Sequence, residues 1–528
     1  MADSCNDAHK GGREGRRLPP TLVLLAILLL GLALRLYQLG EQSLWYDEFI
    51  SLSQTSQPDL LSCLRAERPA NPDMVHAYFT LQYFWANWIG DSVISVRLMS
   101  ILFGVLAIAL IYLLARDLFG PSGGAVAALC LALSSVHIYQ AQEIRYYSLT
   151  TLMALCTAYT FLRVVRGGKW HWWVLNALAN VTLVWTHLFG CFLLVAYGVF
   201  LIIFRWRRVR MCAVWFCVNL VLMLPSLAWI SSIQRVPMPV PPPPLSHLVS
   251  TCIVDCGSRT FHPYPFQGGE WVNMPPEWTR WFTETYPQAD VALLGCFVIA
   301  ALFLVFSTVR QARQNERVPA RPREAIEAFC LPLFITFMPA LTVFALTRVW
   351  RPDCLAQKYT TYCSLGVYLL TGGAVAAMRW RTARIVAVCL LVALYGHRFV
   401  LYGTQTQRTD WVSATQFIEN NARDDAVVIS FNFAQAPVCA YHMEGSGIPV
   451  VMTPYFRHLC EKTEAALDDS KDVWTVSLTV DTPIMERYEM YLDARGISRS
   501  RWAWWAAELP DLVVHRLEPP PGFRAADI

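Results

Sequence analysis

The sequence predicts an α-helical polytopic membrane protein with about eleven transmembrane helices and a small C-terminal extracytoplasmic α/β domain. Of the 528 residues, 55% are hydrophobic and only 16% are charged, whereas a soluble protein typically carries about a quarter charged residues. The apolar residues form long, uniform blocks, and only the last part of the chain alternates between strand-like and helix-like patterns. The first two observations exclude a soluble protein, and the third predicts the C-terminal domain.

The apolar blocks are long enough to cross a bilayer, which takes roughly 17 to 25 mainly apolar residues. The third and fifth blocks are short. The first has a basic leader, as a signal peptide does, but no small-residue cleavage site follows its long apolar run, so we expect it to be retained as a helix. The predicted spans are Thr21–Tyr37, Val93–Ala115, Ala125–Ile138, Ser148–Val165, Trp172–Trp185, Leu188–Phe204, Val214–Ile230, Val291–Ser307, Phe329–Leu346, Cys363–Met378 and Ile385–Leu401.

Basic residues gather in alternate connections, which predicts the orientation of the chain. The basic stretches read KGGREGRR, RVVRGGK, RWRRVR, RQARQNERVPARPR and RWRTAR. Short loops rich in Lys and Arg stay in the cytoplasm, so we expect the N-terminus inside and, with an odd number of spans, the C-terminus outside. The net charge of +4 comes largely from these loops and does not indicate a nucleic-acid partner. The expected location is the cell inner (plasma) membrane.

We therefore divide the chain into a cytoplasmic tail (1–20), a transmembrane domain (21–402) and an extracytoplasmic domain (403–528). Two outer loops, 40–92 and 234–288, are substantial. The second begins with PMPVPPPP, which favours an extended strap, and continues as an aromatic-rich segment that could be an interfacial hairpin or a lid.

The C-terminal domain reads as alternating helices and strands. WVSATQFIENNA and PIMERYEMYLDARG have helical patterns, while DAVVISF, GIPVVMTPY, DVWTVSLTV and LVVHRL read as strands. This alternation indicates a small α/β domain. It contains neither GxGxxG nor GxxxxGK[ST], so we assign it no nucleotide chemistry and expect an accessory or acceptor-contacting module.

The sixteen cysteines are scattered, and many lie inside spans, where they act as small apolar residues. No CxxC pair or Cys/His set has the spacing of a zinc site. Several cysteines lie in predicted outer segments, where a disulfide is possible but its pairing cannot be assigned. Among them are Cys252, Cys256, Cys354, Cys439 and Cys460.

Polar residues gather at the predicted outer ends of the spans. Adjacent carboxylates, Asp47 and Glu48, follow the first span within LWYDEFISL, beside Trp45 and Tyr46. Ionisable groups at a membrane usually mark a substrate path or a paired network. The other members of this group are His76 before the second span, Glu143, Arg145 and Tyr146 between the third and fourth, His187 after the fifth, and Lys358 and Tyr359 before the tenth.

Structural roles compete with functional ones at several of these positions. Tyr146 and Tyr359 could be interfacial anchors, His187 could cap a helix, and Arg35 is expected to extend towards the outer interface. The adjacent carboxylates Asp47 and Glu48, called the DE pair below, do not fit an anchoring role, which favours Lys, Arg or Trp. A short turn such as QEIR likewise hardly needs two charges.

A carboxylate beside several cations suits transfer of a sugar from a lipid-linked phosphate. The phosphate leaves with negative charge, which Arg and Lys stabilise. A carboxylate within hydrogen-bond reach can act as the base for the attacking hydroxyl or amine. Aromatic side chains beside that base can pack against the sugar ring and exclude water.

The motifs resemble those of the GT-C class of polyprenyl-phosphate-dependent glycosyltransferases. The most similar members are bacterial relatives of the protein O-mannosyltransferases and of the lipid A aminoarabinose transferase. The matching segments are RLYQLGEQSLWYDEFISL, GDSVISVRLMSILFGVLAIALIYLLARDLFG, SSVHIYQAQEIRYYSL and WTHLFG, which fall within the first 190 residues. The rest of the chain matches in topology more than in sequence.

The resemblance implies an inverting transfer at the extracytoplasmic face. It gives Asp47 as the general base, Glu48 as its supporting partner and Glu143 as a second acidic residue facing the same cavity. Arg145 and Lys358 are the candidates for binding the donor phosphate. The remaining candidates for substrate binding are Trp45, Tyr46, His76, Tyr146, His187 and Tyr359. The implied partners are a polyprenyl-phosphate-linked sugar, a lipid, glycan or protein acceptor, and membrane lipids.

Two departures from the family pattern stand out. Relatives usually carry HPPLYY before the second span, whereas this chain has NPDMVHAYF, with an unexpected Asp73 and His76 shifted by about two positions. The tenth span is preceded by KY where relatives usually have RY. The first departure puts donor or acceptor selectivity in doubt more than the basic chemistry. No metal is expected to be obligatory, although Asp47, Glu48 and Glu143 could hold a divalent cation.

Two other functions remain open from the sequence. A transporter or lipid flippase would be expected to carry charged residues deep within several spans, and often inverted repeats, and neither is evident. A non-catalytic membrane protein of the same fold, for lipid binding or assembly, is the other alternative.

Overall fold

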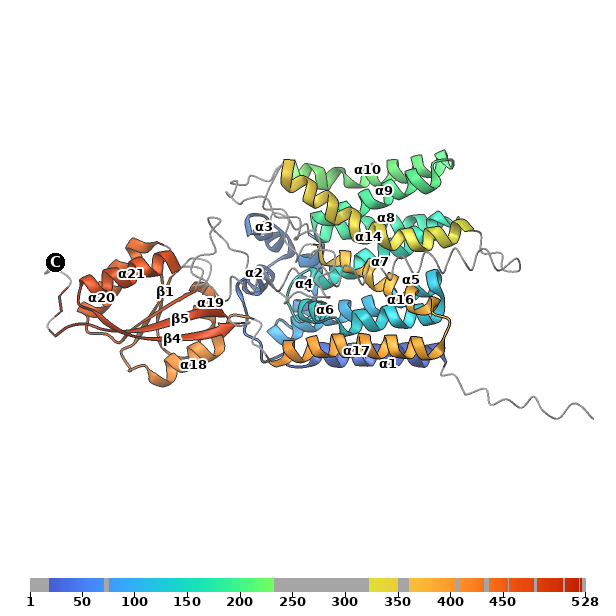
Figure 1. Ribbon diagram of the computed structural model, residues 1–528. Coiled ribbons are helices and arrows are strands. Elements are labelled where there is room, and N and C mark those ends of the chain that lie inside the picture. The colour runs from blue at the N-terminus through green and yellow to red at the C-terminus, as the bar shows by residue number, and fades with distance from the viewer. Residues whose placement is uncertain are drawn as a thin grey trace, which may run out of the picture.

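In the computed structural model, helices form the first part of the chain and a mixed β-sheet domain follows, the two lying end to end (Figure 1). This confirms the predicted fold class. The outer loop 234–288, the predicted span Val291–Ser307, Asp73, Lys358 and Tyr359 lie outside the described residues. The structure describes residues 19–70, 76–231, 322–349, 360–404, 408–431, 436–453, 455–478, 482–506, 509–521 and 523–524.

Helices occupy the predicted spans that fall within the described residues. Five helical stretches are long and apolar enough to cross a membrane: Val93–Leu133, Tyr147–Val165, Leu188–Arg205, Val209–Ser226 and Glu327–Arg348. Pro20–Leu36 and Thr361–Ala377 are shorter apolar helices, so the count of eleven spans stays a prediction. The elements of this part are α1 (Pro20–Leu36), α5 (Val93–Leu133), α7 (Tyr147–Val165), α8 (Trp170–Thr186), η1 (Leu188–Gly190), α9 (Cys191–Arg205), α10 (Val209–Ser231), α14 (Pro322–Val349), η4 (Thr361–Cys363), α16 (Ser364–Ala377) and α17 (Arg381–Thr404).

Helix α5 is a hairpin of two helices, which correspond to the second and third predicted spans. Its backbone leaves the helical conformation at Gly120 (φ 84°, ψ 176°), just before Pro121. Glycine adopts this left-handed φ at little cost. A Cβ on Gly124 would lie 2.8 Å from the carbonyl oxygen of Tyr112, whereas a straight helix would separate these residues by about 18 Å. The chain therefore turns back on itself at Gly120.

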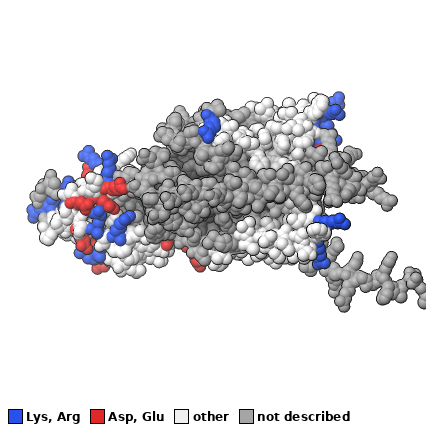
Figure 2. All heavy atoms as spheres, viewed as in Figure 1, with Lys and Arg blue, Asp and Glu red and all other residues white. Residues whose placement is uncertain are grey.

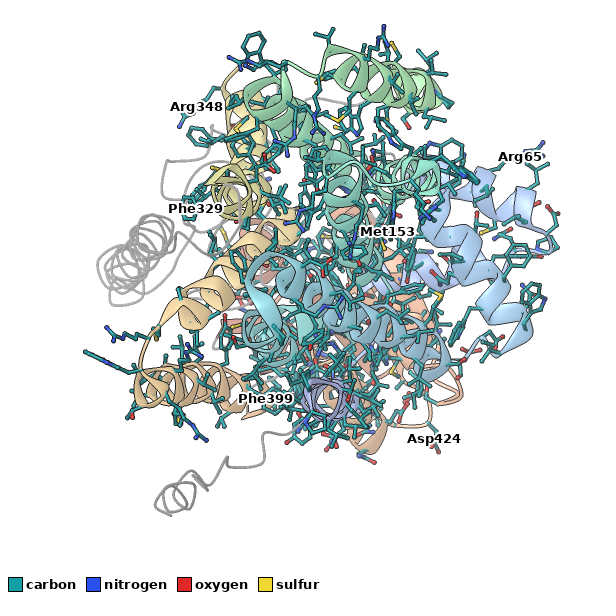
Figure 3. All side chains as sticks on the ribbon, turned by 90° about the vertical axis from the view of Figure 1, so that its right-hand side faces the viewer. Arg65, Met153, Phe329, Arg348, Phe399 and Asp424 are labelled. Atoms are coloured by element: carbon teal, nitrogen blue, oxygen red, sulfur yellow. The ribbon has the colours of Figure 1, made fainter. Side chains whose placement is uncertain are left out.

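Helix α7 lies in the middle of the helical part. Seen along the bundle, Met153 of α7 lies among the other helices, while Arg65 and Arg348 lie at the periphery (Figure 3). Most residues of α7 are buried. The turn that leads into α7, residues 142–146, therefore lies near the centre of one end of the bundle. Glu143 and Arg145 belong to this turn.

The expectation that Arg35 extends towards the interface is wrong. Arg35 is fully buried, and its guanidinium donates to the carbonyl oxygens of Gly31 (3.0 Å), Ala132 (3.2 Å) and Leu131 (3.1 Å). α5 ends at Leu133, and the last carbonyl groups of a helix have no intrahelical partner. Arg35 satisfies them from α1.

Four short helices lie at the end of the helical part that faces the C-terminal domain (Figure 1). α2 (Tyr46–Thr55), α3 (Leu60–Ala70) and α4 (Ala77–Trp88) come from the predicted outer loop 40–92, and α6 (Ser135–Ala141) precedes α7. α4 holds the end of α2, because Gln82 donates to the Ser51 carbonyl (3.1 Å). The predicted loop that contains Asp47 and Glu48 therefore forms helices that pack against each other.

The C-terminal domain is a five-stranded sheet with the order β2-β1-β3-β5-β4. β1, β2 and β3 are parallel, and β5 pairs antiparallel with both β3 and β4. The six predicted elements are confirmed, whereas α19, α20 and β4 were not predicted. The elements are α18 (Trp411–Asn421), β1 (Val427–Phe431), α19 (Ala436–His442), β2 (Val450–Thr453), α20 (Phe456–Asp468), β3 (Val473–Leu478), α21 (Thr482–Ala494), β4 (Ser498–Ala506) and β5 (Leu509–Glu518).

Charge is unevenly distributed along the molecule (Figure 2). On the face shown, acidic and basic residues mix on the C-terminal domain, while Lys and Arg appear at the opposite end of the helical part. The α9–α10 and α16–α17 connections lie at that opposite end (Figure 1) and carry RWRRVR and RWRTAR. This gathering is what the positive-inside rule expects of the cytoplasmic end. The membrane sidedness itself stays a prediction.

Candidate active site

The DE pair occupies the first turn of α2, which begins directly after the extended residue Trp45. Carboxylates favour this position because of the positive end of the helix dipole. Adjacent helical residues point about 100° apart, so one of the two carboxylates can face the bundle while the other faces outward. The Glu48 side chain is fully buried, and the Asp47 side chain is 20% exposed.

Glu48 lies in a buried network in which both of its oxygens are occupied. Oε1 accepts from Arg97 Nε (3.0 Å) and from the Ile144 backbone N–H (2.9 Å). Oε2 accepts from Arg97 Nη2 (2.9 Å) and Arg408 Nη1 (2.8 Å). The three charged side chains are at most 1% exposed.

The charge of Glu48 is set by this network. Burial alone would raise the pKa of Glu48, but the positive charges of Arg408 and Arg97, with the hydrogen bonds from Arg97 and Ile144, outweigh it and lower the pKa below its usual value. Glu48 is therefore an ionised, fully hydrogen-bonded anchor of α2. It has no free oxygen with which to take a proton from a substrate.

Asp47 lies beside Arg145, which comes from the turn before α7. Arg145 Nη2 lies 3.7 Å from Asp47 Oδ2, and Nη1 donates to the Asp47 carbonyl oxygen (3.3 Å) and to Ser51 Oγ (3.2 Å). Asp47 thus offers a partly exposed carboxylate beside a cation. This arrangement suits a base next to a group that can bind an anion.

Arg145 continues into an aromatic stack. Its guanidinium lies 5.4 Å from the ring centroid of Tyr146, and Tyr146 stacks on His187 with centroids 4.7 Å apart. His187 also follows the end of α8, and its Nδ1 accepts from the Phe189 N–H (3.3 Å). His187 therefore has the capping role considered from the sequence, and it also supports Tyr146.

A small cavity lies beside Tyr146. The space open to the centre of a water molecule is about 10 Å³, which is room for about one water. Each of the residues that line it carries a hydroxyl or amide group: Gln140, Tyr146, Tyr147, Thr150, Thr151, Thr361 and Tyr362.

Glu143 differs from both carboxylates of the DE pair. It is fully buried, and burial raises its pKa to about 8. The negative charges of Glu48 and Asp47 add to this shift, while the positive charge of Arg408 and a hydrogen bond with Tyr139 oppose it. Glu143 is therefore mainly a neutral carboxylic acid at pH 7, which can donate a hydrogen bond.

The remaining predicted residues are distributed around this centre. Tyr46 packs against the core of the C-terminal domain, while Trp45 is partly buried at the start of α2. His76 precedes α4, with its ring 6.4 Å from that of Trp185. The structure therefore brings Asp47, Glu48, Glu143, Arg145, Tyr146 and His187 together, whereas Lys358 and Tyr359 lie outside the described residues.

Within the described ranges, no three His, Cys, Asp or Glu side chains are grouped as they would be to hold a metal. Glu48 is not available as a ligand, because two guanidiniums and a backbone N–H occupy its oxygens. The expectation that no metal is obligatory stays a prediction.

Arg97 and Arg408 were not among the predicted site residues. Arg97 is the one charged residue in the apolar run 93–115 of α5, which is itself a signal of a paired network. Arg408 follows the last span by a few residues. Its distance of 360 residues from Glu48 hides the pairing in the sequence.

Comparison with known proteins agrees with the motifs in this region. Residues 74–229 match the family model described as dolichyl-phosphate-mannose-protein mannosyltransferase. No curated protein sequence is significantly similar to the chain.

Several solved structures align with most of this chain at low sequence identity. ArnT from Cupriavidus metallidurans in the apo state is 14% identical, with 94% of this chain and 97% of that chain covered and a TM-score of 0.44. The same protein bound to undecaprenyl phosphate has the same identity and coverage and a TM-score of 0.42. The Archaeoglobus fulgidus oligosaccharyltransferase in complex with Zn and sulfate is 14% identical, covers 90% and 70%, and has a TM-score of 0.46. The family match over residues 74–229 confirms the resemblance to the GT-C glycosyltransferases.

Proposed function

We propose that the protein is an inverting glycosyltransferase that moves a hexose or pentose from a polyprenyl-phosphate carrier to an acceptor at the extracytoplasmic membrane face. The acceptor is a hydroxyl or amine of a lipid, glycan or protein. The family match over residues 74–229 supports a transferase. The geometry of the DE pair supports the assignment of roles.

The observation that carries the proposal is the different environment of the two adjacent carboxylates. Glu48 is buried on two arginines, whereas Asp47 is partly exposed beside Arg145. In this proposal, Asp47 takes the proton of the acceptor hydroxyl or amine while the oxygen or nitrogen of that acceptor group bonds to the anomeric carbon of the sugar. The bond from that carbon to the phosphate oxygen breaks, and the phosphate leaves with the electron pair.

We assign the phosphate end of the site to Arg145 and Lys358. Arg145 already lies beside the base, and cations placed where charge develops lower the barrier. Tyr146, His187, Trp45, His76 and Tyr359 are proposed to surround the substrate. Tyr46 also packs against the C-terminal domain, and its contact with the substrate stays a prediction.

Glu143 is proposed to contribute a hydrogen bond rather than a second base. Its buried carboxyl is mainly protonated at pH 7, so it can donate to an oxygen of the sugar or the phosphate. An ionised carboxylate in the same place would instead repel the phosphate.

The test is to incubate the purified full-length protein in nanodiscs with a panel of polyprenyl-phosphate sugars and a membrane extract rich in acceptors. Release of free polyprenyl phosphate is measured for wild type, Asp47→Asn and Asp91→Asn. Asp91 is a matched control, because it is an exposed aspartate in the same outer region. We expect sugar-dependent release by wild type and Asp91→Asn, and loss of release in Asp47→Asn.

Near-normal turnover in Asp47→Asn would remove the assigned base. No release from any donor would favour a non-catalytic protein or a transporter, and gradient-coupled substrate movement in proteoliposomes would identify the transporter.

A further inference from the structure

Arg408 connects the two parts of the molecule at the site itself. It lies between the end of α17 at Thr404 and the start of α18 at Trp411, where the chain enters the C-terminal domain. Its side chain is 1% exposed. Nη1 donates to Glu48 Oε2 (2.8 Å), and Nη2 donates to the Gln142 carbonyl oxygen (3.1 Å). One guanidinium therefore joins the domain linker, α2 and the turn that leads to Glu143 and Arg145.

Besides the packing of Tyr46, three further contacts between described residues join the C-terminal domain to the segment around the DE pair. The Val412 N–H donates to Ser43 Oγ (3.2 Å). His442 Nε2 lies 3.1 Å from the Leu44 carbonyl oxygen, which can only accept, so this nitrogen carries the proton. Both contacts come from residues that follow Arg408 in the chain, one in α18 and one in α19.

The third contact is aromatic and lies on the other side of the DE pair. Tyr441 packs edge-on against Phe49, with ring centroids 6.2 Å apart. Figure 1 shows α2 between the sheet domain and the long helices. The short segment 43–49 is therefore held from the bundle side by Arg97 and from the domain side by Arg408, α18 and α19.

We propose that Arg408 is a positioning residue for the transfer reaction, which ties the C-terminal domain to Glu48 and thereby holds Asp47 in its working orientation. The inference rests on the proposed function for its kinetic consequence. Asp47 directly precedes Glu48 in α2, so a rotation or shift of this helical turn moves both carboxylates. The active site is complete only when the C-terminal domain is docked.

The network also predicts how Arg408 affects the pH dependence. The charged and titratable groups around Glu48 are Arg408 from the domain linker, Arg97 from α5, Tyr78 from α4, Tyr139 from α6, Glu143 from the turn before α7 and Tyr402 from α17. Loss of Arg408 removes one of the positive charges that offset burial. The pKa of Glu48 then rises, and the acidic limb of the transfer rate moves to higher pH.

The experiment compares full-length wild type, Arg408→Gln, Arg408→Lys and Arg423→Gln in nanodiscs. Arg423 is a matched control, because it lies in the same domain and its side chain makes a largely exposed ion pair with Asp425. Two quantities are measured: the kinetics of polyprenyl phosphate release between about pH 5 and pH 8, and hydrogen exchange of the α2 amides.

For Arg408→Gln we expect kcat to fall about 100-fold, with KM for the donor within about twofold, as a misplaced group produces. We expect faster exchange in α2 and an acidic limb at higher pH. Arg408→Lys keeps the charge but cannot reproduce both fixed hydrogen bonds, so its kcat should fall about tenfold with the limb nearly unmoved. Arg423→Gln should match wild type in every measurement.

Wild-type kinetics or unchanged exchange of α2 in Arg408→Gln would overturn the inference. If that variant does not fold, Arg408→Lys decides, and wild-type kcat and exchange in it would overturn the inference too. If wild type itself transfers no sugar, the proposed function fails. The exchange of α2 still tests Arg408, because that measurement needs no substrate.

Discussion

Replacement of Glu48 by Gln should loosen α2 far more than replacement of Asp47 by Asn. Glu48 accepts four hydrogen bonds at 2.8–3.0 Å from Arg97, Arg408 and Ile144. The substitution leaves two buried guanidiniums without their counter-charge and places an amide donor against other donors. Removing one partner of a buried ion pair costs about 3–5 kcal/mol.

Asp47 gives the contrast. Its carboxylate is 20% exposed and lies 3.7 Å from Arg145 Nη2, farther than the 2.8–3.0 Å hydrogen bonds of Glu48. We therefore expect Asp47→Asn to lose transfer with a smaller change in the stability of α2 than Glu48→Gln. Glu48→Gln should lose both.

The assay is hydrogen exchange of the α2 amides in the full-length protein in nanodiscs. A loss of about 3 kcal/mol in the free energy of local opening corresponds to exchange more than about 100-fold faster. Glu41→Gln is the matched control, because Glu41 is an exposed glutamate in the same outer segment. Exchange in Glu48→Gln within about threefold of wild type would refute the reasoning that this network anchors α2.

Three further predictions follow from single residues. Burial raises the pKa of Glu143 from 4.5 to about 8, so the contribution of this group to stability is fully present below pH 4.5 and is lost as the pH rises towards 8. Thermal unfolding at a series of pH values should therefore show that the stability of Glu143→Gln relative to wild type rises between pH 4.5 and 8 and then levels off. Gly120→Ala should lower the unfolding temperature, since φ is +84° there and such strain costs about 1–3 kcal/mol, whereas Gly396→Ala, where a Cβ meets nothing within 4 Å, should raise it. Arg145→Gln should lower kcat for donor turnover by about 10²–10³ and Arg145→Lys by less; equal rates in the two variants would show that the charge is not what matters.

The helical part could be predicted from the sequence because each span is a local property of the chain. The hairpin in α5 also has a local signal, since Gly120 and Pro121 separate its two apolar runs. No local sequence signal indicates the burial of Arg35, because its partners Leu131 and Ala132 lie almost 100 residues away.

The same limit applies to the candidate site. The DE pair stands out in LWYDEFISL, but the difference between Asp47 and Glu48 depends on Arg97 and Arg408, which reach Glu48 from 49 and 360 residues away. In the C-terminal domain, α20 could have been found, because its buried residues Leu459, Thr463 and Leu467 recur at helical spacing.

The configuration of the transferred sugar tests the central claim most directly. Wild-type protein is given the donor identified by the panel, and the anomeric configuration of the purified product is determined by NMR. With Asp47 as a base that activates the acceptor, the attack is direct and the product has the configuration opposite to that of the donor. Retained configuration would contradict the account, because it requires a covalent sugar–enzyme intermediate and a nucleophile where we place a base.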